Sequence, residues 1–260
     1  MAIPRQSLRP NYGIDAPNVI RNLLLAAFIG IAVWVGTMLA ASSGRFDIPR
    51  PILAVTGIGF TTGIGCGLMA GWMLWDSRIG KLRSREKLLD RISWSGNEQV
   101  LDVGCGRGLL LNGAAKRLNT GRAIGIDIWQ AEDLTGNNPA AALENARLEQ
   151  VPERVSVQTG DMRRMPFGDG TFDVVVSGAA IHNLYKAEDR TAAIREIARV
   201  LKPGGRAVIE DIRHGSQYAL TFSQNGCKDI RRVDSALLGV LLMLITFGSM
   251  QPATLVVRKD

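Results

Sequence analysis

Two long uncharged stretches lie in the first quarter of the chain, at residues 22–44 and 51–75. Each is long enough to cross about 30 Å of hydrocarbon at about 1.5 Å per helical residue. A short charged link with a proline, residues 45–50, separates them. The pattern therefore predicts a hairpin of two transmembrane helices, at about 22–42 and 52–75. A cleaved signal peptide is the alternative for the first stretch, but this stretch exceeds a signal's apolar region and a second span follows directly.

Basic residues are concentrated around this predicted hairpin. Up to Arg91 the chain has 11 basic and 5 acidic residues, and after it 20 basic and 19 acidic residues. Anionic lipid headgroups explain this excess better than nucleic acid does, so the lipid bilayer is the expected partner and no nucleic acid is expected. The positive-inside rule then predicts an integral membrane protein with both termini and the following domain in the cytoplasm, residues 1–21 being the cytoplasmic N-terminal segment.

Glycines recur every four residues along one face of the second predicted span, at Gly59, Gly63, Gly67 and Gly71. A face without side chains lets another helix approach closely. We favour the first span of the same hairpin as that helix, with a homodimer or a slot for a lipid tail as alternatives. Residues 76–93 then carry apolar residues at helical spacing and basic residues between them, which predicts an amphipathic juxtamembrane helix.

Residues 94–260 alternate short β-rich runs with helical stretches. This alternation predicts an α/β domain with a doubly wound, mostly parallel seven-stranded sheet covered by helices on both faces. The predicted strands are 99–103, 123–127, 155–159, 172–177, 206–212, 227–232 and 253–257. The predicted helices are 108–118, 139–149 with Asn138 as its N-cap, and 188–201. An apolar run at 236–247 is too short to span a bilayer, and we interpret it as a buried helix or hairpin rather than a segment that dips into lipid.

The first predicted strand leads into a glycine-rich turn, with Gly104, Gly106 and Gly108 downstream of Asp102. Glycines there permit positive φ and let a ligand approach the backbone. The NAD-binding fingerprint requires a glycine one position later, where this chain has Leu109. A NAD-dependent oxidoreductase is therefore disfavoured, although it stays open as an alternative.

Five motifs follow one another in the order VLDVGCGRG, GIDIW, VQTGDMRRMPF, FDVVVSGAAIHN and REIARVLKPGGRAVIEDI. Together, over about residues 100–212, they resemble the class I S-adenosylmethionine-dependent methyltransferases, in particular the ubiquinone/menaquinone-biosynthesis-like branch with its methyltransferase type 11 domain. The resemblance implies a Rossmann-like methyltransferase fold and S-adenosyl-L-methionine as the cofactor.

The resemblance also implies roles for single residues. The turn around the methionine part of the cofactor would consist of Asp102, Gly104, Cys105, Gly106 and Gly108. Asp127 would accept the ribose hydroxyl protons, with Ile128 and Trp129 flanking the adenine. Asp161, between Gly160 and Met162, would bind the adenine amino group, and Ser177 and Gly178 would lie under the reactive methyl. We interpret Cys105 as a small buried residue rather than a reactive thiol.

The chain has only two histidines, His182 and His214, and both follow the carboxyl ends of predicted strands. This edge holds the ligand in open α/β sheets, so both are catalytic candidates. A histidine suits a general base if the acceptor is a hydroxyl, and we assign that role to His182. Either histidine could also be an ordinary surface or core residue.

Metal binding is not expected, because no carboxylate or cysteine cluster accompanies the histidines. The three cysteines lack CxxC spacing and are predicted to be free thiols in a reducing compartment. A methyl-accepting metalloid would require several thiols around the pocket, so it is disfavoured as a substrate.

The expected function is a membrane-anchored methyltransferase that acts on a small lipophilic acceptor, a quinone precursor or a lipid. Protein methylation is a further possibility within the same class. The alternative from another class is a non-catalytic, S-adenosylmethionine-binding membrane sensor or scaffold. His182, His214 and the acceptor pocket distinguish an enzyme from such a protein, since both kinds need the glycine loop.

Overall fold

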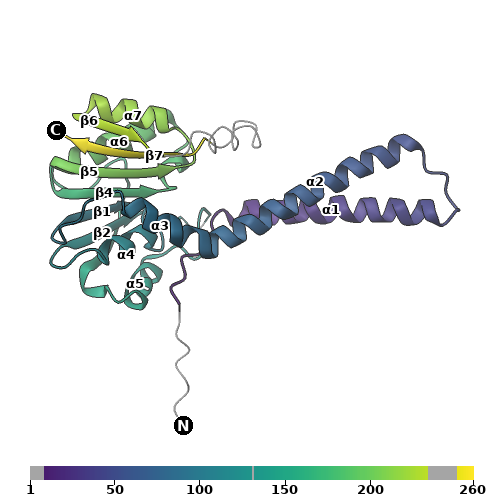
Figure 1. Cartoon of the computed structure of the whole chain (residues 1–260), viewed down its shortest axis with the longest axis horizontal. Coiled ribbons are helices and arrows are strands. Elements are labelled where there is room, and N and C mark those ends of the chain that lie inside the picture. Colours follow the sequence, from purple (N-terminus) through teal and green to yellow (C-terminus); the bar gives the residue numbers. More distant parts are fainter. Residues whose placement is uncertain (1–8, 131, 234–250) are drawn as a thin grey trace, which may run out of the picture. The chain divides into compact units, whose positions relative to one another are not determined.

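The computed structural model describes residues 9–130, 132–233 and 251–260 (Figure 1). The chain forms two compact units. The sheet-containing unit consists of residues up to Tyr12, Leu82–Gln130 and Gly136–Asp260, and the helical unit of Gly13–Lys81 and Ala131–Thr135. The apolar run predicted at 236–247 lies outside the described residues.

The helical unit is a hairpin of α1 (Pro17–Ser42) and α2 (Arg50–Trp75), which lie side by side in Figure 1. Prolines at the start of each helix suit positions whose N–H groups have no partner within the helix. Both helices are long and apolar enough to cross a membrane by length and composition. After α2 the helical backbone continues through a π-helical turn, η1 (Asp76–Gly80), into α3 (Lys81–Leu89).

Glycines allow the two long helices to approach closely. A Cβ on Gly30 would lie 2.4 Å from the carbonyl oxygen of Gly59, and one on Gly63 would lie 3.1 Å from that of Ala27. Trp34 and Phe60 stack between the same helices, with ring centroids 4.3 Å apart. This geometry supports the favoured interpretation, in which the glycine face packs against the first helix of the same hairpin. A homodimer through that face stays a proposal.

The sheet-containing unit has seven strands in the order β3-β2-β1-β4-β5-β7-β6. Neighbouring strands among β1 to β5 are parallel, and β7 is antiparallel to both of its neighbours. The strands are β1 (Gln99–Val103), β2 (Arg122–Asp127), β3 (Val155–Thr159), β4 (Phe172–Gly178), β5 (Leu201–Asp211), β6 (Cys227–Arg232) and β7 (Ala253–Lys259). This architecture confirms the predicted α/β fold with a doubly wound, mostly parallel seven-stranded sheet.

Two strands begin earlier than predicted, β2 by one residue, at Arg122, and β5 by five. β5 starts at Leu201 rather than at residue 206, because Leu201 pairs with Phe172 before a register shift between Phe172 and Val174. Pro203, Gly204 and Gly205 therefore lie within this irregular part of β5.

The helices of this unit are α4 (Leu109–Ala115), α5 (Pro139–Leu148), α6 (Ala187–Val200) and α7 (Gly215–Gln224). Short 3₁₀ turns occur at η2 (Pro152–Arg154) and η3 (Ile181–Asn183). Asn138 caps α5 as predicted, its side chain accepting a hydrogen bond from the Ala141 N–H. α4 is shorter than predicted because Arg117 and Leu118 bond to carbonyls three residues earlier, which tightens the helix end.

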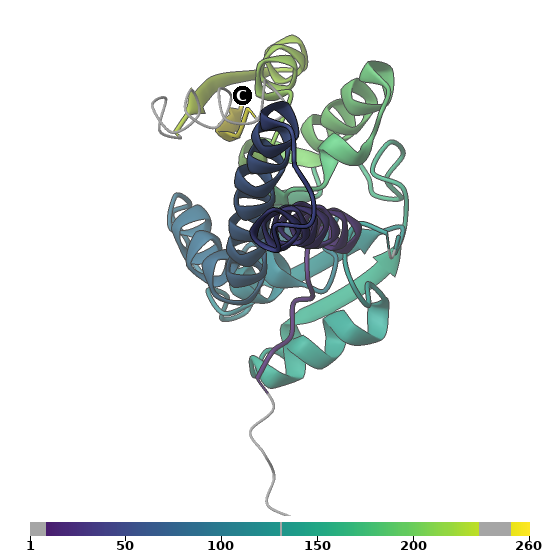
Figure 2. The same cartoon turned by 90° about the vertical axis from the view of Figure 1, so that its right-hand side faces the viewer.

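Apolar side chains alternate between the two faces of the sheet. In β1, Val100 packs on the side of α4, whereas Leu101 and Val103 pack on the side of α6 and α7. Figure 2 shows helices on both sides of the sheet. Leu88 and Leu89 of α3 are buried in the core on the α4 side, and Arg85 is buried as well. Part of the helix predicted at 76–93 thus belongs to the core of this unit.

We expect Gly30→Ala to destabilise the helical hairpin by about 1–3 kcal/mol, because the new methyl group would overlap the Gly59 carbonyl. Gly36→Ala is the matched control, since a Cβ on Gly36 has no atom within 4 Å. Thermal unfolding of both variants in the same detergent would test this. Equal melting temperatures would show that the close approach of the helices contributes nothing to stability.

Candidate active site

The loops that follow β1 to β5 lie at the carboxyl edge of the parallel strands. The strand order reverses between β1 and β4, and ligands of open α/β sheets bind outside the strand ends at such a point. Gly104, after β1, has a φ of 72°, and a Cβ on it would lie 2.4 Å from the Cβ of Ala180, after β4. Only glycine satisfies both conditions without strain, so the loops after β1 and β4 touch at this residue.

Three residues other than glycine adopt positive φ at this edge. Trp129 follows β2 with a φ of 62°, Ala179 follows β4 with 49° and His214 follows β5 with 65°. Backbone strain of this kind concentrates at functional sites. The strain lies at the same edge as the glycine loop after β1.

The end of β2 holds the glycine loop. The Gly104 and Cys105 N–H groups donate to the Ile126 carbonyl at 2.8 and 3.1 Å. The Gly106 N–H donates to Asp127 Oδ2 at 2.8 Å. The Trp129 N–H donates to the other carboxylate oxygen at 2.6 Å, which fixes the orientation of Asp127. Asn137 Nδ2 also donates to Oδ1, at a longer 3.4 Å. Asp127 can therefore accept from two hydroxyls of a ligand if one of them replaces the Asn137 amide.

Asp102 is buried beneath this loop. Its Oδ2 accepts from the Leu111 N–H at 2.8 Å, whereas Oδ1 has no hydrogen-bond partner among the described residues. Burial raises the pKa of Asp102 to about 8. Once ionised, the unpaired Oδ1 would accept from a cationic donor such as the α-ammonium group of a bound S-adenosylmethionine, whose charge would lower the pKa of Asp102 again.

Two of the proposed cofactor residues have packing roles. The Cys105 sulfur fills the space where a Cβ on Gly125 would lie only 2.6 Å away, and burial raises the pKa of this thiol well above its usual value. Cys105 is therefore a small buried residue, as interpreted from the sequence. The Ser177 hydroxyl donates to the Val103 carbonyl at 2.8 Å, so it links β4 to β1.

The residues after β3 lie beside the same loop. The Met162 methyl group lies 3.5 Å from where a Cβ on Gly104 would be, and Gly160 packs against Ile126. Asp161 forms an ion pair with Arg163 at 2.6 Å, which keeps the pKa of Asp161 below its usual value. Its proposed bond to the adenine amino group would share a carboxylate that Arg163 already occupies. Ile128 is half-exposed, as an adenine-flanking side chain would be before ligand binding.

His182 forms a pair with a residue that the sequence analysis did not single out. Its Nδ1 lies 2.6 Å from Asp211 Oδ1, and Asp211 Oδ2 accepts from the His182 backbone N–H at 2.9 Å. The buried Tyr218 hydroxyl donates to the same oxygen at 3.1 Å. An ionised carboxylate only accepts, so we assign the hydrogen to Nδ1, which makes Nε2 the ring nitrogen that can take a proton. Asp211 ends β5 as Asp127 ends β2, and this placement was the available sequence signal.

His214 lies at the start of α7, with its ring 6.4 Å from that of Tyr218. Burial and the nearby Arg190 lower the pKa of His214, so its ring is neutral at pH 7. The structure thus brings both histidines to the carboxyl edge, but only His182 has a carboxylate at hydrogen-bond distance. Among the described residues, no group of three histidine, cysteine or carboxylate side chains could hold a metal ion.

Residues 101–209 match the family described as "Methyltransferase domain". A "Methyltransferase GfsG" of Streptomyces halstedii is 35% identical over 130 residues, which are 50% of this chain and 43% of that protein. A demethylmenaquinone methyltransferase of Lactiplantibacillus plantarum is 37% identical over 48% of this chain and 49% of its own length. The chloroplastic 2-phytyl-1,4-beta-naphthoquinone methyltransferase of Arabidopsis thaliana is 34% identical over 51% and 50%. The chain thus spans about half the length of these relatives.

Solved structures show the same fold. Geranyl diphosphate C-methyltransferase from Streptomyces coelicolor superposes with a TM-score of 0.53 at 17% identity, over 68% of this chain and 76% of its own. The [4+2]-cyclase SpnF gives 0.53 at 22% identity, over 69% and 81%. Residues 101–209 thus match a methyltransferase domain family, and these solved structures show that the chain shares their α/β fold.

The raised pKa of Asp102 predicts a pH dependence of stability. Its folded pKa of about 8 exceeds the ordinary 3.8, so the folded state binds a proton that the unfolded state releases. Between about pH 4 and pH 8 this group lowers the free energy of unfolding as pH rises, by up to about 1.4 kcal/mol per pH unit, and the loss levels off above the folded pKa. Urea unfolding at pH 6, 7 and 8 should therefore show a flatter profile for Asp102→Asn. Parallel profiles for the two proteins would contradict a protonated Asp102.

Proposed function

We propose that the chain is a membrane-anchored methyltransferase that transfers a methyl group from S-adenosyl-L-methionine to a small lipophilic acceptor. The observation that carries the proposal is the hydrogen bond from the Gly106 N–H to Asp127. It joins a glycine loop that can surround the methionine part to a carboxylate that can bind the ribose. The two groups lie on adjacent strands, β1 and β2, at the ligand-binding edge.

The chemistry follows from what each residue can do. S-adenosylmethionine, when bound, supplies a methyl group already activated on a sulfonium. The protein contributes alignment and exclusion of water, which Asp127 and the glycine loop support by fixing the donor. His182 Nε2 accepts the proton that the acceptor loses, and Asp211 stabilises the resulting imidazolium through Nδ1. His214, which is neutral at pH 7, is the second candidate for contact with the acceptor.

Exposed apolar surface supports the membrane anchor. Phe28 and Ile29 of α1 and Leu68 of α2 are exposed, with 70%, 59% and 72% of their surface accessible. A soluble protein rarely leaves such extended apolar faces in water, whereas a bilayer covers them. The basic residues on either side of the hairpin support cytoplasmic ends and a cytoplasmic catalytic domain.

Two relatives support a lipophilic quinone as the acceptor. Their names specify demethylmenaquinone and 2-phytyl-1,4-beta-naphthoquinone as substrates. Both are isoprenoid quinones, which partition into membranes, and an anchored enzyme would meet them there. A lipid acceptor is the alternative within the same class. SpnF is named as a cyclase on this fold, so a non-methylating role such as a cofactor-binding sensor is the second candidate function.

Calorimetric titration of the detergent-solubilised chain with S-adenosylmethionine, S-adenosylhomocysteine and NAD tests the cofactor. We expect the first two to bind and Asp127→Ala to weaken both by about 100-fold, since two hydrogen bonds to a charged group are lost. Asp173→Ala is the control, because Asp173 also accepts a backbone bond, from Gln99, but at the opposite ends of the strands. Binding of NAD alone would refute the proposal.

Turnover with a naphthoquinol acceptor tests the proposed base. We expect His182→Ala to lower kcat by about 10²–10⁴-fold with an unchanged Kd for S-adenosylhomocysteine, because the ring acts on the acceptor and not on the donor. Asp211→Asn should lower kcat as well, since the amide cannot stabilise the imidazolium. Unchanged turnover in both variants would exclude His182 as the base.

A further inference from the structure

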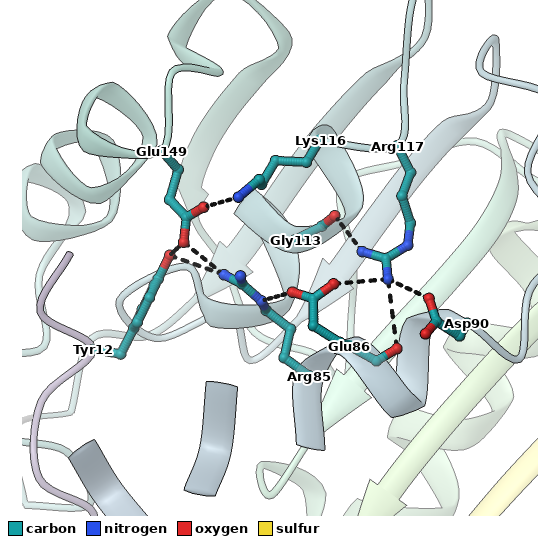
Figure 3. Close-up of polar contacts among 8 residues, drawn as sticks. All are labelled: Tyr12, Arg85, Glu86, Asp90, Gly113, Lys116, Arg117 and Glu149. Atoms are coloured by element: carbon teal, nitrogen blue, oxygen red, sulfur yellow. Dashed lines mark hydrogen bonds and ion pairs between the residues drawn. The ribbon is translucent and has the colours of Figure 1, made fainter. Parts of the chain in front are cut away.

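A buried ionic cluster lies in the sheet-containing unit (Figure 3). Arg85 Nη1 of α3 lies 2.8 Å from Glu149 Oε1, at the end of α5. The Tyr12 hydroxyl donates to the same oxygen at 2.9 Å and lies 3.3 Å from Arg85 Nη1. Lys116 pairs with the second Glu149 oxygen at 2.6 Å. The side chains of Tyr12, Arg85 and Glu149 are all buried.

The charges in this cluster are fixed at neutral pH. Burial alone would raise the pKa of Glu149, but hydrogen bonds from Arg85 and Lys116 lower it to about 2. Burial and the charge of Glu149 raise the pKa of Tyr12, so its hydroxyl keeps its proton. Removing one partner of a buried pair leaves the other charge uncompensated, which is strongly unfavourable. Tyr12 is therefore held firmly to α3 and α5.

The residue before Tyr12 is bound through Asn145, one turn earlier on α5. The Asn145 Oδ1 accepts from the Asn11 N–H, and Nδ2 donates to the Asn11 carbonyl, both at 2.9 Å. The same Nδ2 donates to the Arg107 carbonyl at 2.9 Å. Asn145 is 2% exposed, so no water competes for these bonds. One buried amide thus connects Asn11 to the residue between Gly106 and Gly108.

We propose that Asn145 is a positioning residue for the cofactor loop and that residues 11–12, here called the strap, hold Asn145 in place. The proposal rests on the proposed function. Gly104, Gly106 and Gly108 all have positive φ, and a glycine loop loses much conformational freedom when it is ordered. A hydrogen bond at Arg107 that exists before the ligand arrives reduces the ordering that binding requires. The side chain of Asn145 contributes through the loop backbone and not by contact with substrate.

The strap also lies where the chain passes between the two units. The chain leaves the sheet-containing unit after Tyr12 and returns to it at Leu82, three residues before Arg85. Tyr12 is thus the last residue before the chain leaves this unit, and Arg85 comes three residues after its return. A member of the ionic cluster therefore lies close in sequence to each passage.

The test compares Asn145→Ala with Glu144→Ala in the full chain in detergent. Glu144 is its exposed neighbour on α5 and pairs with Arg147. We expect Asn145→Ala to weaken S-adenosylhomocysteine binding about tenfold and to raise the KM for S-adenosylmethionine while kcat at saturation stays near the wild-type value. Glu144→Ala should bind like the wild type. A lower melting temperature with unchanged affinity would mean that Asn145 is only structural, and it would overturn the proposal.

Hydrogen exchange of the ligand-free protein gives a second readout. The amides of residues 104–109 should exchange faster in Asn145→Ala, and also in Tyr12→Phe, which loses the hydroxyl bond to Glu149 but keeps the ring. Amides of β6, at the far edge of the sheet, should not change in either variant. Unchanged exchange at 104–109 would overturn the proposal. If the wild-type chain binds neither S-adenosyl compound, the proposed function fails, while the exchange data still decide whether Asn145 holds the loop.

Discussion

The geometry of the site depends on hydrogen bonds between the loop after β1 and the end of β2. A loop with three glycines has little intrinsic preference for one shape. Here the Ile126 carbonyl and the Asp127 carboxylate accept its first three N–H groups. Their position is fixed by the parallel register that pairs Val103 with Ile126. A slip of one residue would turn the side chains of β2 to the opposite face, so the register of two strands determines where a cofactor could bind.

Two carboxylates with buried side chains show how the number of nearby donors decides the state of an acid. Asp102 receives one backbone N–H, and its burial raises its pKa to about 8. Glu149 receives bonds from Arg85, Lys116 and Tyr12, and its pKa falls to about 2. The same chemical group therefore serves the fold as a neutral acid at one site and as a fixed anion at another.

The features that could be predicted from the sequence are those that depend on residues close together in the chain. Central strands of a parallel sheet are buried on both faces and read as short apolar runs, which is why β1 has its predicted bounds. The glycine loop and Asp127 follow such strands directly, so their placement could be predicted too. Asp211 was missed because an acid at a strand end is common, and its role depends on His182, which is 29 residues earlier.

The contacts of the strap could not be predicted for a related reason. Tyr12 meets Arg85 across 73 positions, and Asn11 meets Asn145 across 134. No local pattern of hydrophobic and polar residues encodes such a pairing. Asn145 in particular has the appearance of an ordinary polar residue in a helix until the fold places two backbone carbonyls beside its amide.

The position of β7 bears on the order in which the sheet can be completed during synthesis. β7 follows β6 in the chain but lies between β5 and β6, and among the strands that the structure describes β7 alone pairs with β6. Until residue 259 has been made, β5 presents an open edge whose Val208 and Ile209 belong to the future core. During synthesis from the N-terminus, such an unpaired edge can pair with other chains and aggregate until its partner strand has been made. The hairpin and the residues of the cofactor loop are therefore synthesised long before the sheet that supports them can close.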